Sequence, residues 1–171
     1  MRAVSLKTEY MQNPCGIDIA KPRLSWLCEE GLRQTAYEIR AVSGATEIWN
    51  SGLVESGKMS AFPDAALQSR EHVEWRVRLW DENGSEGPWS EAASFEMGLL
   101  EREDYSAKWI NPELACDPSV HKPASYLRKR FSVPTGFDRA RLYITAHGLY
   151  EASLNGTRVG DFVLAPRLVQ L

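Results

Sequence analysis

The most regular pattern in the chain is an alternation of apolar and charged side chains that begins at Val73. Apolar residues occupy every second position from Val73 to Leu79, and Glu or Arg stands between them. A period of two is typical of a strand with one face in a core and the other in solvent. The run ends at residues 81–84, Asp-Glu-Asn-Gly, where Asn and Gly tolerate positive φ. We therefore predict a long hairpin in which residues 91–97 return to the same core.

Shorter alternations predict more strands before this hairpin, at residues 3–10, 23–27, 35–42 and 47–54, the last with a bend. Residues 59–67 predict a short edge strand, because Pro63 cannot donate to a ladder. Residues 13–18 contain both Pro and Gly and predict a loop. Short strands separated by turn signals over about a hundred residues are typical of a β-sandwich. We expect this first domain to end near Gly98.

A segment of different character follows Gly98. Residues 99–104 are rich in charge and predict one helical turn, and residues 108–112 predict a docking segment with Trp109 as its anchor. Residues 113–123 have no period and contain Pro118 and Pro123. This composition predicts an exposed loop.

Strand patterning then resumes in three apolar alternations, at residues 126–133, 139–146 and 150–154. Asn155-Gly156, directly after the last of them, is a strong hairpin signal. We therefore expect an all-β protein with a sandwich at residues 1–98, a linker at residues 99–124 and an incomplete antiparallel β-domain at residues 125–171. Unpaired edges in the last segment predict a homodimer through its open sheet. Alternatively, its strands extend the first domain.

The long hairpin resembles the last two strands of a fibronectin type III domain. The resemblance rests on Trp75-Arg76-Val77-Arg78, on the turn at residues 81–84 and on Pro88-Trp89-Ser90. It implies that Trp89 lies on the outer face of the sheet, stacked between Arg76 and Arg78. Val73 stands where that family usually has a tyrosine, so the hydroxyl that ties down a corner of such domains is missing.

The order of motifs along nearly the whole chain is similar to that of bacterial α-L-rhamnosidases. The motifs are short blocks spread over both β regions: Asn13–Asp18, Lys21–Trp26, Gln34–Tyr37, Ala107–Ile110, Tyr126–Lys129, Ala140–Ala146 and Gly148–Gly156. The resemblance implies a fibronectin type III-like domain followed by the start of a jelly-roll domain. In the family an (α/α)6 barrel comes next and hydrolyses terminal α-L-rhamnosides with inversion.

An inverting glycosidase uses one carboxylic acid to protonate the leaving oxygen and a second carboxylate to activate water. In the family both groups belong to the barrel, so we assign no catalytic residue, no cofactor and no metal ligand to this chain. The expected function is noncatalytic support of the barrel of a glycoside hydrolase, and the chain alone is expected to be inactive. The alternative is a stand-alone β-sandwich module that binds carbohydrate or protein.

The acidic, histidine and cysteine side chains are interpreted as structural and not as catalytic or metal-binding residues. Asp81, Glu82 and Glu86 share one turn without a pocket-forming segment, so we interpret them as solvated carboxylates. The cysteines are too few for a disulfide framework. The histidines and cysteines also lack metal-ligand spacing: His72, His121, His147, Cys15, Cys28 and Cys116.

The six tryptophans divide into groups according to the strand faces on which they fall. Three lie on apolar faces and are expected in the core: Trp26, Trp49 and Trp75. Trp80 and Trp89 are expected in the exposed stack with arginine. A sugar-stacking role is therefore not assigned to any of them.

Charge and hydropathy exclude several classes of partner. The net charge is -3, from 20 basic and 23 acidic residues, which provides no basic surface for nucleic acid or an anionic membrane. The N-terminus lacks the apolar stretch of a signal peptide, and no run approaches the roughly 20 apolar residues of a membrane span. These features predict a cytoplasmic setting.

The last residues depart from the family pattern. The family usually continues Leu164-Ala165-Pro166 with Gly-Trp, whereas this chain reads Arg167-Leu168-Val169. Deleting one base from a codon series for this ending restores Gly-Trp. We therefore hypothesise that a single-base insertion changed the reading frame and separated the chain from its barrel.

Overall fold

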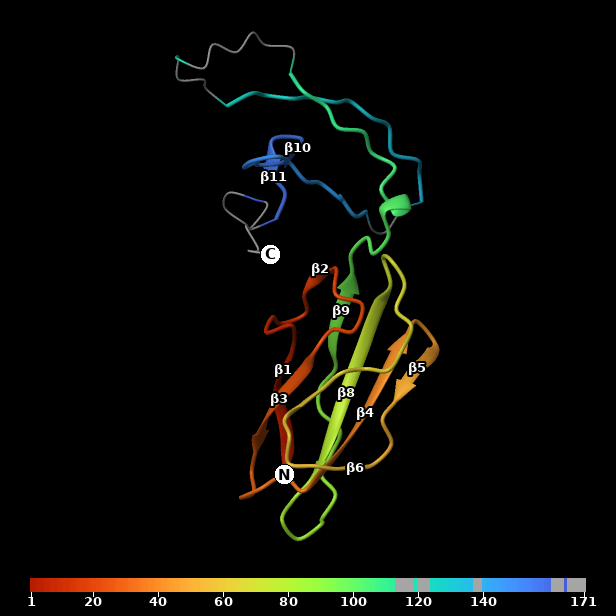
Figure 1. Cartoon of the computed structure of the whole chain (residues 1–171), viewed down its shortest axis with the longest axis vertical. Coiled ribbons are helices and arrows are strands. Elements are labelled where there is room, and N and C mark those ends of the chain that lie inside the picture. Colours follow the sequence, from red (N-terminus) through yellow and green to blue (C-terminus); the bar gives the residue numbers. More distant parts are fainter. Residues whose placement is uncertain (113–118, 120–123, 137–139, 161–164, 166–171) are drawn as a thin grey trace. The chain divides into compact units, whose positions relative to one another are not determined.

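The computed structural model describes residues 1–112, 119, 124–136, 140–160 and 165 (Figure 1). It divides into two compact units, Met1–Ile110 and Asn111–Leu171. No helix in these described ranges is long and apolar enough to cross a membrane. The predictions for Cys116, for His121 and for the reading-frame change after Pro166 lie outside the described residues, as does the loop predicted at residues 113–123 apart from residue 119.

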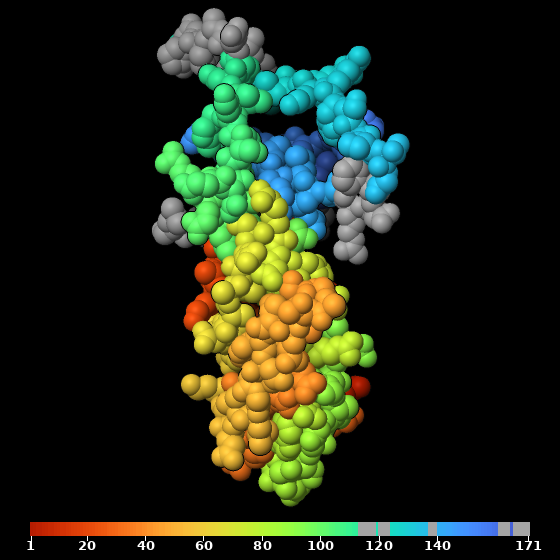
Figure 2. Space-filling view, turned by 90° about the vertical axis from the view of Figure 1, so that its right-hand side faces the viewer, coloured from red at the N-terminus to blue at the C-terminus, as the bar shows by residue number. Residues whose placement is uncertain are grey.

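The first unit is a β-sandwich of two sheets. The smaller sheet has the order β1 (Arg2–Thr8), β3 (Leu24–Glu29), β7 (Ser60–Ala61). The larger sheet has the order β2 (Cys15–Ile17), β9 (Ala93–Met97), β8 (His72–Trp80), β4 (Ala36–Ser43), β5 (Thr46–Asn50), and β6 (Val54–Glu55) also pairs with β4. Figure 2 views this unit from the side of β5, which forms the rim of the larger sheet.

Strand β8 lies at the centre of the larger sheet, between β9 and β4. Its alternate residues from Val73 to Leu79 are buried, so the predicted period of two is confirmed. The neighbouring strands β4 and β9 and the facing strand β3 complete the core, whose largest buried side chains include Trp75, Phe95, Leu24, Ile39 and Met97. The core also contains Trp26, whose ring meets the Tyr37 ring edge-on with centroids 5.1 Å apart.

The predicted hairpin is present, but β9 pairs only with the first half of β8. The second half of β8 is met by an irregular segment, in which the Gly87 N–H donates to the Leu79 carbonyl at 2.8 Å and the Ser90 N–H to the Val77 carbonyl at 2.9 Å. The hairpin is therefore longer than its regular ladder, and β9 begins at Ala93 instead of the expected residue 91.

The prediction of a loop at residues 13–18 is wrong, because these residues contain the strand β2. Residues Cys15 and Ile17 pair in parallel with Glu96 and Met97 of β9, with an irregular register between the two pairs. Gly16 lies between them at φ +83, a conformation that glycine adopts without strain. The N-terminal segment thus belongs to both sheets: it contributes β1 to the smaller sheet and then crosses to contribute β2 to the larger sheet.

The remaining strand predictions for the sandwich are confirmed with small shifts of their ends. The expected bend in residues 47–54 separates β5 from β6, and the predicted edge strand is β7 at the end of the smaller sheet. A single 3₁₀ turn, Arg102–Asp104, forms within residues 99–104, where one helical turn was predicted. Trp109 is 66% exposed, and its role as the anchor of a docking segment stays a prediction.

The second unit contains one short hairpin, β10 (Ser153–Leu154) and β11 (Thr157–Arg158), among its described residues. Its two turn residues, Asn155 and Gly156, have φ of 50° and 84°, as the predicted Asn-Gly turn requires. The strands predicted at residues 126–133 and 139–146 are wrong, because residues 126–133 and the described residues 140–146 have no strand. Of the strand predicted at residues 150–154, only Ser153–Leu154 is present. Alternation favours a strand only where a partner strand accepts its hydrogen bonds.

Candidate functional site

The outer face of the larger sheet carries a group of charged side chains around one tryptophan, which we name the Trp89 cluster: Glu38, Arg40, Arg78, Glu86 and Trp89. Glu38 and Arg40 alternate with core residues along β4, and Arg78 does the same on β8. These three side chains therefore face away from the core, while the segment after β8 brings Glu86 and Trp89 back to them.

Glu38 is the buried centre of the cluster, with only 7% of its surface exposed. Arg78 donates to Glu38 Oε2 from Nε at 2.9 Å and from Nη2 at 2.6 Å. Arg40 Nε donates to the other oxygen, Oε1, at 3.3 Å. Arg78 Nη1 also donates to Glu86. Each buried charge therefore has a partner of opposite sign, as burial requires.

The ring of Trp89 lies beside two guanidinium groups. The Cζ atom of Arg78 is 4.8 Å from the ring centroid, and that of Arg40 is 5.1 Å away. Arg78 also lies 5.1 Å from the Trp80 ring centroid, so the expected stack of Trp80 and Trp89 with arginine is confirmed. The prediction that Arg76 is the second cation is wrong, because the second guanidinium beside Trp89 is that of Arg40.

Arg40 was not predicted as a partner of Trp89, because the alternation within β8 does not show which strand lies beside β8 in the sheet. Arg40 and Arg76 are directly opposite each other on β4 and β8, so both project from the outer face of the sheet. The signal that could have found Arg40 is its own alternation with Ile39 and Ala41. That alternation places Arg40 on the outer face, but only the β4–β8 register shows which residues of β8 lie beside it.

The turn carboxylates were interpreted as solvated, and the structure gives two of them specific bonds. Asp81 Oδ1 accepts from the N–H groups of Ser85 and Asn83, each at 2.9 Å, and these bonds hold its pKa below the ordinary value. Glu82 Oε2 accepts from the backbone of Leu32 and Arg33, and backbone hydrogen bonds likewise lower its pKa. Both groups stay ionised at neutral pH, which suits a loop anchor and not a general acid.

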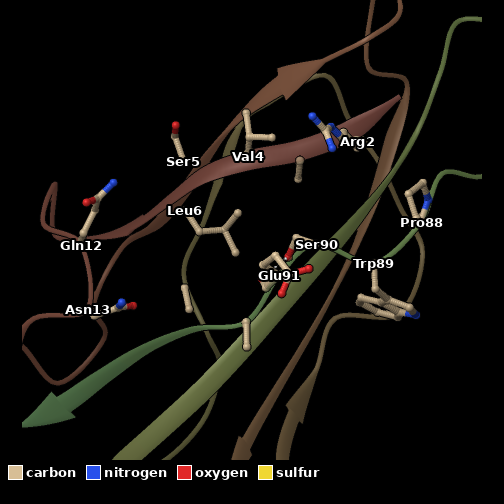
Figure 3. Close-up of a pocket in the computed structure, with 13 residues that line it drawn as sticks. Arg2, Val4, Ser5, Leu6, Gln12, Asn13, Pro88, Trp89, Ser90 and Glu91 are labelled. Atoms are coloured by element: carbon tan, nitrogen blue, oxygen red, sulfur yellow. Dashed lines mark hydrogen bonds between the residues drawn. The ribbon is translucent and has the colours of Figure 1, made fainter.

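A groove of about 600 Å³ runs between β1 and residues 88–93 (Figure 3). At one end Met1 packs so closely on Gly87 that a Cβ there would lie 2.0 Å from the Met1 carbonyl oxygen. Near the other end Asn13 Oδ1 accepts from the Ser94 N–H at 2.9 Å. In Figure 3 Leu6 points toward Glu91, whereas Ser5 lies on the opposite side of β1. The polar side chains do not converge, so the groove has the character of a seam between sheets.

The thiols and imidazoles do not form a metal centre in the described part of the chain, where no three metal-ligating side chains come together. Cys15 is exposed, with its Sγ 3.6 Å from Glu96 Oε1, and Cys28 is half-buried, with its Sγ 3.4 Å from Gln34 Oε1. Burial raises the pKa of the Cys28 thiol, which disfavours the reactive thiolate. His72 is exposed at the start of β8.

The tryptophans expected in the core are divided by the structure. Trp26 and Trp75 are buried, and Trp49 packs partly exposed against the core. The Trp26 Nε1–H donates to Gln34 Oε1 at 2.9 Å, and the Gln34 amide donates to the carbonyls of Ser56 and Lys58. Trp75 Nε1 is buried without a partner. The aromatic groups thus stabilise the sandwich and do not form a sugar platform inside it.

Fold and site together define a β-sandwich module of the immunoglobulin-like type. Residues 3–101 match the family model of the Rha78A-like, N-terminal immunoglobulin domain, and residues 136–171 match that of the alpha-L-rhamnosidase N-terminal domain. The chain belongs to the α-L-rhamnosidase family and corresponds to its N-terminal region. Immunoglobulin and fibronectin type III domains share this sandwich architecture, so the expected fold class is confirmed.

Several relatives agree with this assignment. The chain is 39% identical to an α-L-rhamnosidase of Alteromonas sp. (strain LOR), over 91% of this chain and 19% of that protein. The crystal structure of native α-L-rhamnosidase from Aspergillus terreus superposes with a TM-score of 0.75 at 29% identity, over 96% of this chain and 20% of that one. Streptomyces avermitilis α-L-rhamnosidase, solved with L-rhamnose, gives a TM-score of 0.59 at 39% identity, over 64% of this chain and 12% of that one. The chain spans about a fifth of the length of the curated relatives that it matches.

Proposed function

We propose that this chain supports and orients the catalytic part of an enzyme that hydrolyses terminal α-L-rhamnosides, and that it has no turnover of its own. The observation that carries the proposal is the family match over both ends of the chain. The parent reaction needs two carboxyl groups across a scissile bond, about 6.5–9.5 Å apart. In the sandwich, Glu38, Asp81 and Glu82 instead bond to arginine or backbone groups.

We also propose the division of labour among its segments. Residues 1–98 are a fibronectin type III-like sandwich, residues 99–124 are the linker and docking segment, and residues 125–171 begin a second β-domain of the jelly-roll type. The two family matches, to residues 3–101 and 136–171, support two domains separated by a linker.

The decisive experiment combines an assay with a binding measurement. The purified chain is incubated with a chromogenic α-L-rhamnoside, alone and with the part of the Alteromonas enzyme that this chain does not match. We expect no turnover above a mock purification from the chain alone, and a raised melting temperature of the Alteromonas part when the chain is added. Turnover by the chain alone would overturn the proposal and require a catalytic pair among its own carboxylates.

We propose self-association for the chain in isolation. Large apolar side chains of the second unit are exposed, among them Tyr126 at 99%, Phe131 at 63% and Leu142 at 54%. Exposed apolar surface of this kind is typical of interaction sites. Light scattering tests the idea: a dimeric mass that becomes monomeric in a Tyr126→Ser, Phe131→Ser variant supports it, and a monomeric wild-type chain contradicts it.

We propose a cytoplasmic setting, supported by the small number of cysteines, three in 171 residues, and by the half-buried thiol of Cys28. Proteins of oxidising compartments usually pair such cysteines. Fractionation of the native cells, followed by immunodetection of the chain, tests this assignment. Recovery from the periplasm or the medium would contradict it.

A further inference from the structure

The smaller sheet carries a second group of exposed side chains, which we name the Tyr10–Arg23–Phe62 row. Glu9 N–H donates to the Arg23 carbonyl at 3.0 Å, so the ladder between β1 and β3 continues past Thr8 to the residue before Tyr10. On the other side of β3, Leu24 pairs with Ala61, which places Phe62 opposite Arg23. Leu24 is fully buried, so its neighbours Arg23 and Phe62 project from the outer face.

Tyr10 is held in place by an unusual turn. Thr8 and Met11 exchange two backbone hydrogen bonds of 2.9 Å, and the two residues between them, Glu9 and Tyr10, have φ of 47° and 67°. Non-glycine residues in this left-handed region store strain, which is found most often at functional positions. The turn presents the Tyr10 side chain with 70% of its surface exposed, next to Met11 at 45%.

Arg23 in the middle of the row is a cation without an acceptor. Its Cζ atom lies 3.7 Å from the Tyr10 ring centroid, and its Nε is buried without a hydrogen-bond partner. The Glu9 carboxylate accepts from the Arg23 backbone N–H and not from the guanidinium. Among the residues that the structure describes, no oxygen accepts a hydrogen bond from this guanidinium. The Nη groups of Arg23 are not among the buried unpaired atoms, so a carboxylate can approach them and accept charge-assisted hydrogen bonds.

The surroundings of the row indicate which kind of molecule supplies that carboxylate. Phe62 is 60% exposed, and Met11 lies at the other end of the row. Tyr, Phe, Met and Arg are the residue types enriched in protein interfaces. An acidic sugar would need several convergent hydroxyl or amide groups, whereas the row offers only the guanidinium and one phenol.

We propose that the Tyr10–Arg23–Phe62 row is a docking site for a polypeptide segment of the catalytic part, in which an Asp or Glu side chain meets Arg23 and a neighbouring apolar side chain lies between Tyr10 and Phe62. This inference rests on the proposed function and adds the surface and the chemistry of its contact. Charge complementarity identifies the occupant: Glu9 bonds to the Arg23 backbone and leaves the guanidinium without a carboxylate, so a partner that brings a carboxylate and an apolar side chain fits the row.

The test measures binding of the complete chain to the part of the Alteromonas enzyme that the chain does not match, by calorimetry. Arg23→Gln removes the cation and is expected to weaken binding about tenfold or more, because it leaves the partner's carboxylate unpaired. Arg33→Gln is the matched control. Arg33 is exposed, and within the described part of the chain its guanidinium makes no hydrogen bond, so a change below about twofold is expected.

Further variants separate a binding defect from a folding defect. Arg23→Lys keeps the charge and loses the planar fork, so its affinity should fall between those of wild type and Arg23→Gln. Each variant must keep the near-UV circular dichroism of the wild-type chain. An Arg23→Gln variant that loses this signal is replaced by Phe62→Ser, which is expected to weaken binding about fivefold or more through lost apolar contact.

The outcomes are distinguishable. If the wild-type chain does not bind, the proposed function and this inference both fail. If it binds and the folded Arg23 and Phe62 variants bind equally well, the inference alone fails. Binding of oligogalacturonate by wild type, lost in Arg23→Gln while protein binding persists, would overturn the assignment to a polypeptide and identify an acidic-sugar site.

Discussion

Glu38 and Arg78 lie directly opposite each other on β4 and β8, and two nitrogens of the arginine donate to one oxygen of the carboxylate at 2.9 and 2.6 Å. Directly opposed residues of opposite charge stabilise a strand pair, and burial strengthens the interaction. Because Arg78 also reaches Glu86 and the Trp89 ring, this pair connects the central ladder to the segment that returns from it.

Glu38→Ala is expected to lower the free energy of unfolding by about 2–3 kcal/mol, below the usual cost of breaking a buried pair because Arg78 keeps Glu86. Glu47→Ala is the control, since Glu47 is half exposed and 4.0 Å from Arg40; it should cost less than about 0.5 kcal/mol. Urea unfolding measures both. Equal effects of the two substitutions would contradict a buried, organising role for Glu38.

Trp89→Ala is expected to cost about 2 kcal/mol, because two guanidinium groups lose their contact with one ring. Trp89→Phe keeps an aromatic face and should cost about half as much. The measurement is the urea midpoint at low and high salt. A Phe variant as unstable as the Ala variant would show that indole size, and not the aromatic face, stabilises the cluster.

Trp26→Phe and Trp75→Phe form a matched pair, because both rings are at least 98% buried. Only Trp26 has a partner for its indole N–H, the Gln34 side chain. Trp26→Phe leaves Gln34 short of a donor, whereas Trp75→Phe removes an orphaned donor. We expect Trp26→Phe to be more destabilising by about 1 kcal/mol in thermal unfolding. The reverse order would show that Trp75 finds a partner in solution.

Stability is expected to fall in acid through the loop carboxylates. Hydrogen bonds from the Ser85 backbone lower the pKa of Asp81, and a bond from the Ser69 hydroxyl lowers that of Asp104. A depressed folded-state pKa contributes stability above the unfolded value, about 4 for Asp, which is lost as pH falls through the folded value. Asp81→Asn should therefore be less stable at pH 7 and show a shallower loss below about pH 5. Parallel pH profiles for wild type and variant would contradict this linkage.

The sandwich could be predicted because its strands carry the pattern in their own sequences. From Val73 to Leu79 each apolar position is buried, since every strand that packs on β8 presents its own apolar face. Strand β2 could not be found in this way, because Pro14 and Gly16 are local signals for a turn. Its pairing with Glu96 and Met97 is set by the rest of the fold, about 80 residues away.

The candidate contacts were less predictable than the fold. The stack around Trp89 was placed on the correct face, but the choice between Arg40 and Arg76 depends on cross-strand geometry. The row around Arg23 left no sequence signal, because a missing acceptor is a property of three-dimensional surroundings. The strand prediction around Tyr126 failed for the opposite reason. The alternation there is clear, but the described part of the chain supplies no strand beside it.

The crossing of the N-terminal segment from β1 to β2 has a mechanical consequence. Strand β2, at the edge of the larger sheet, runs parallel to its neighbour β9, and the sandwich ends just after β9. A pull between Met1 and Gly98 therefore acts first along β1 and its ladder with β3, and then along the β2–β9 pairs, so that the hydrogen bonds of both ladders are loaded in shear instead of opening one at a time. Such a module transmits tension along its length without unravelling from its first residue.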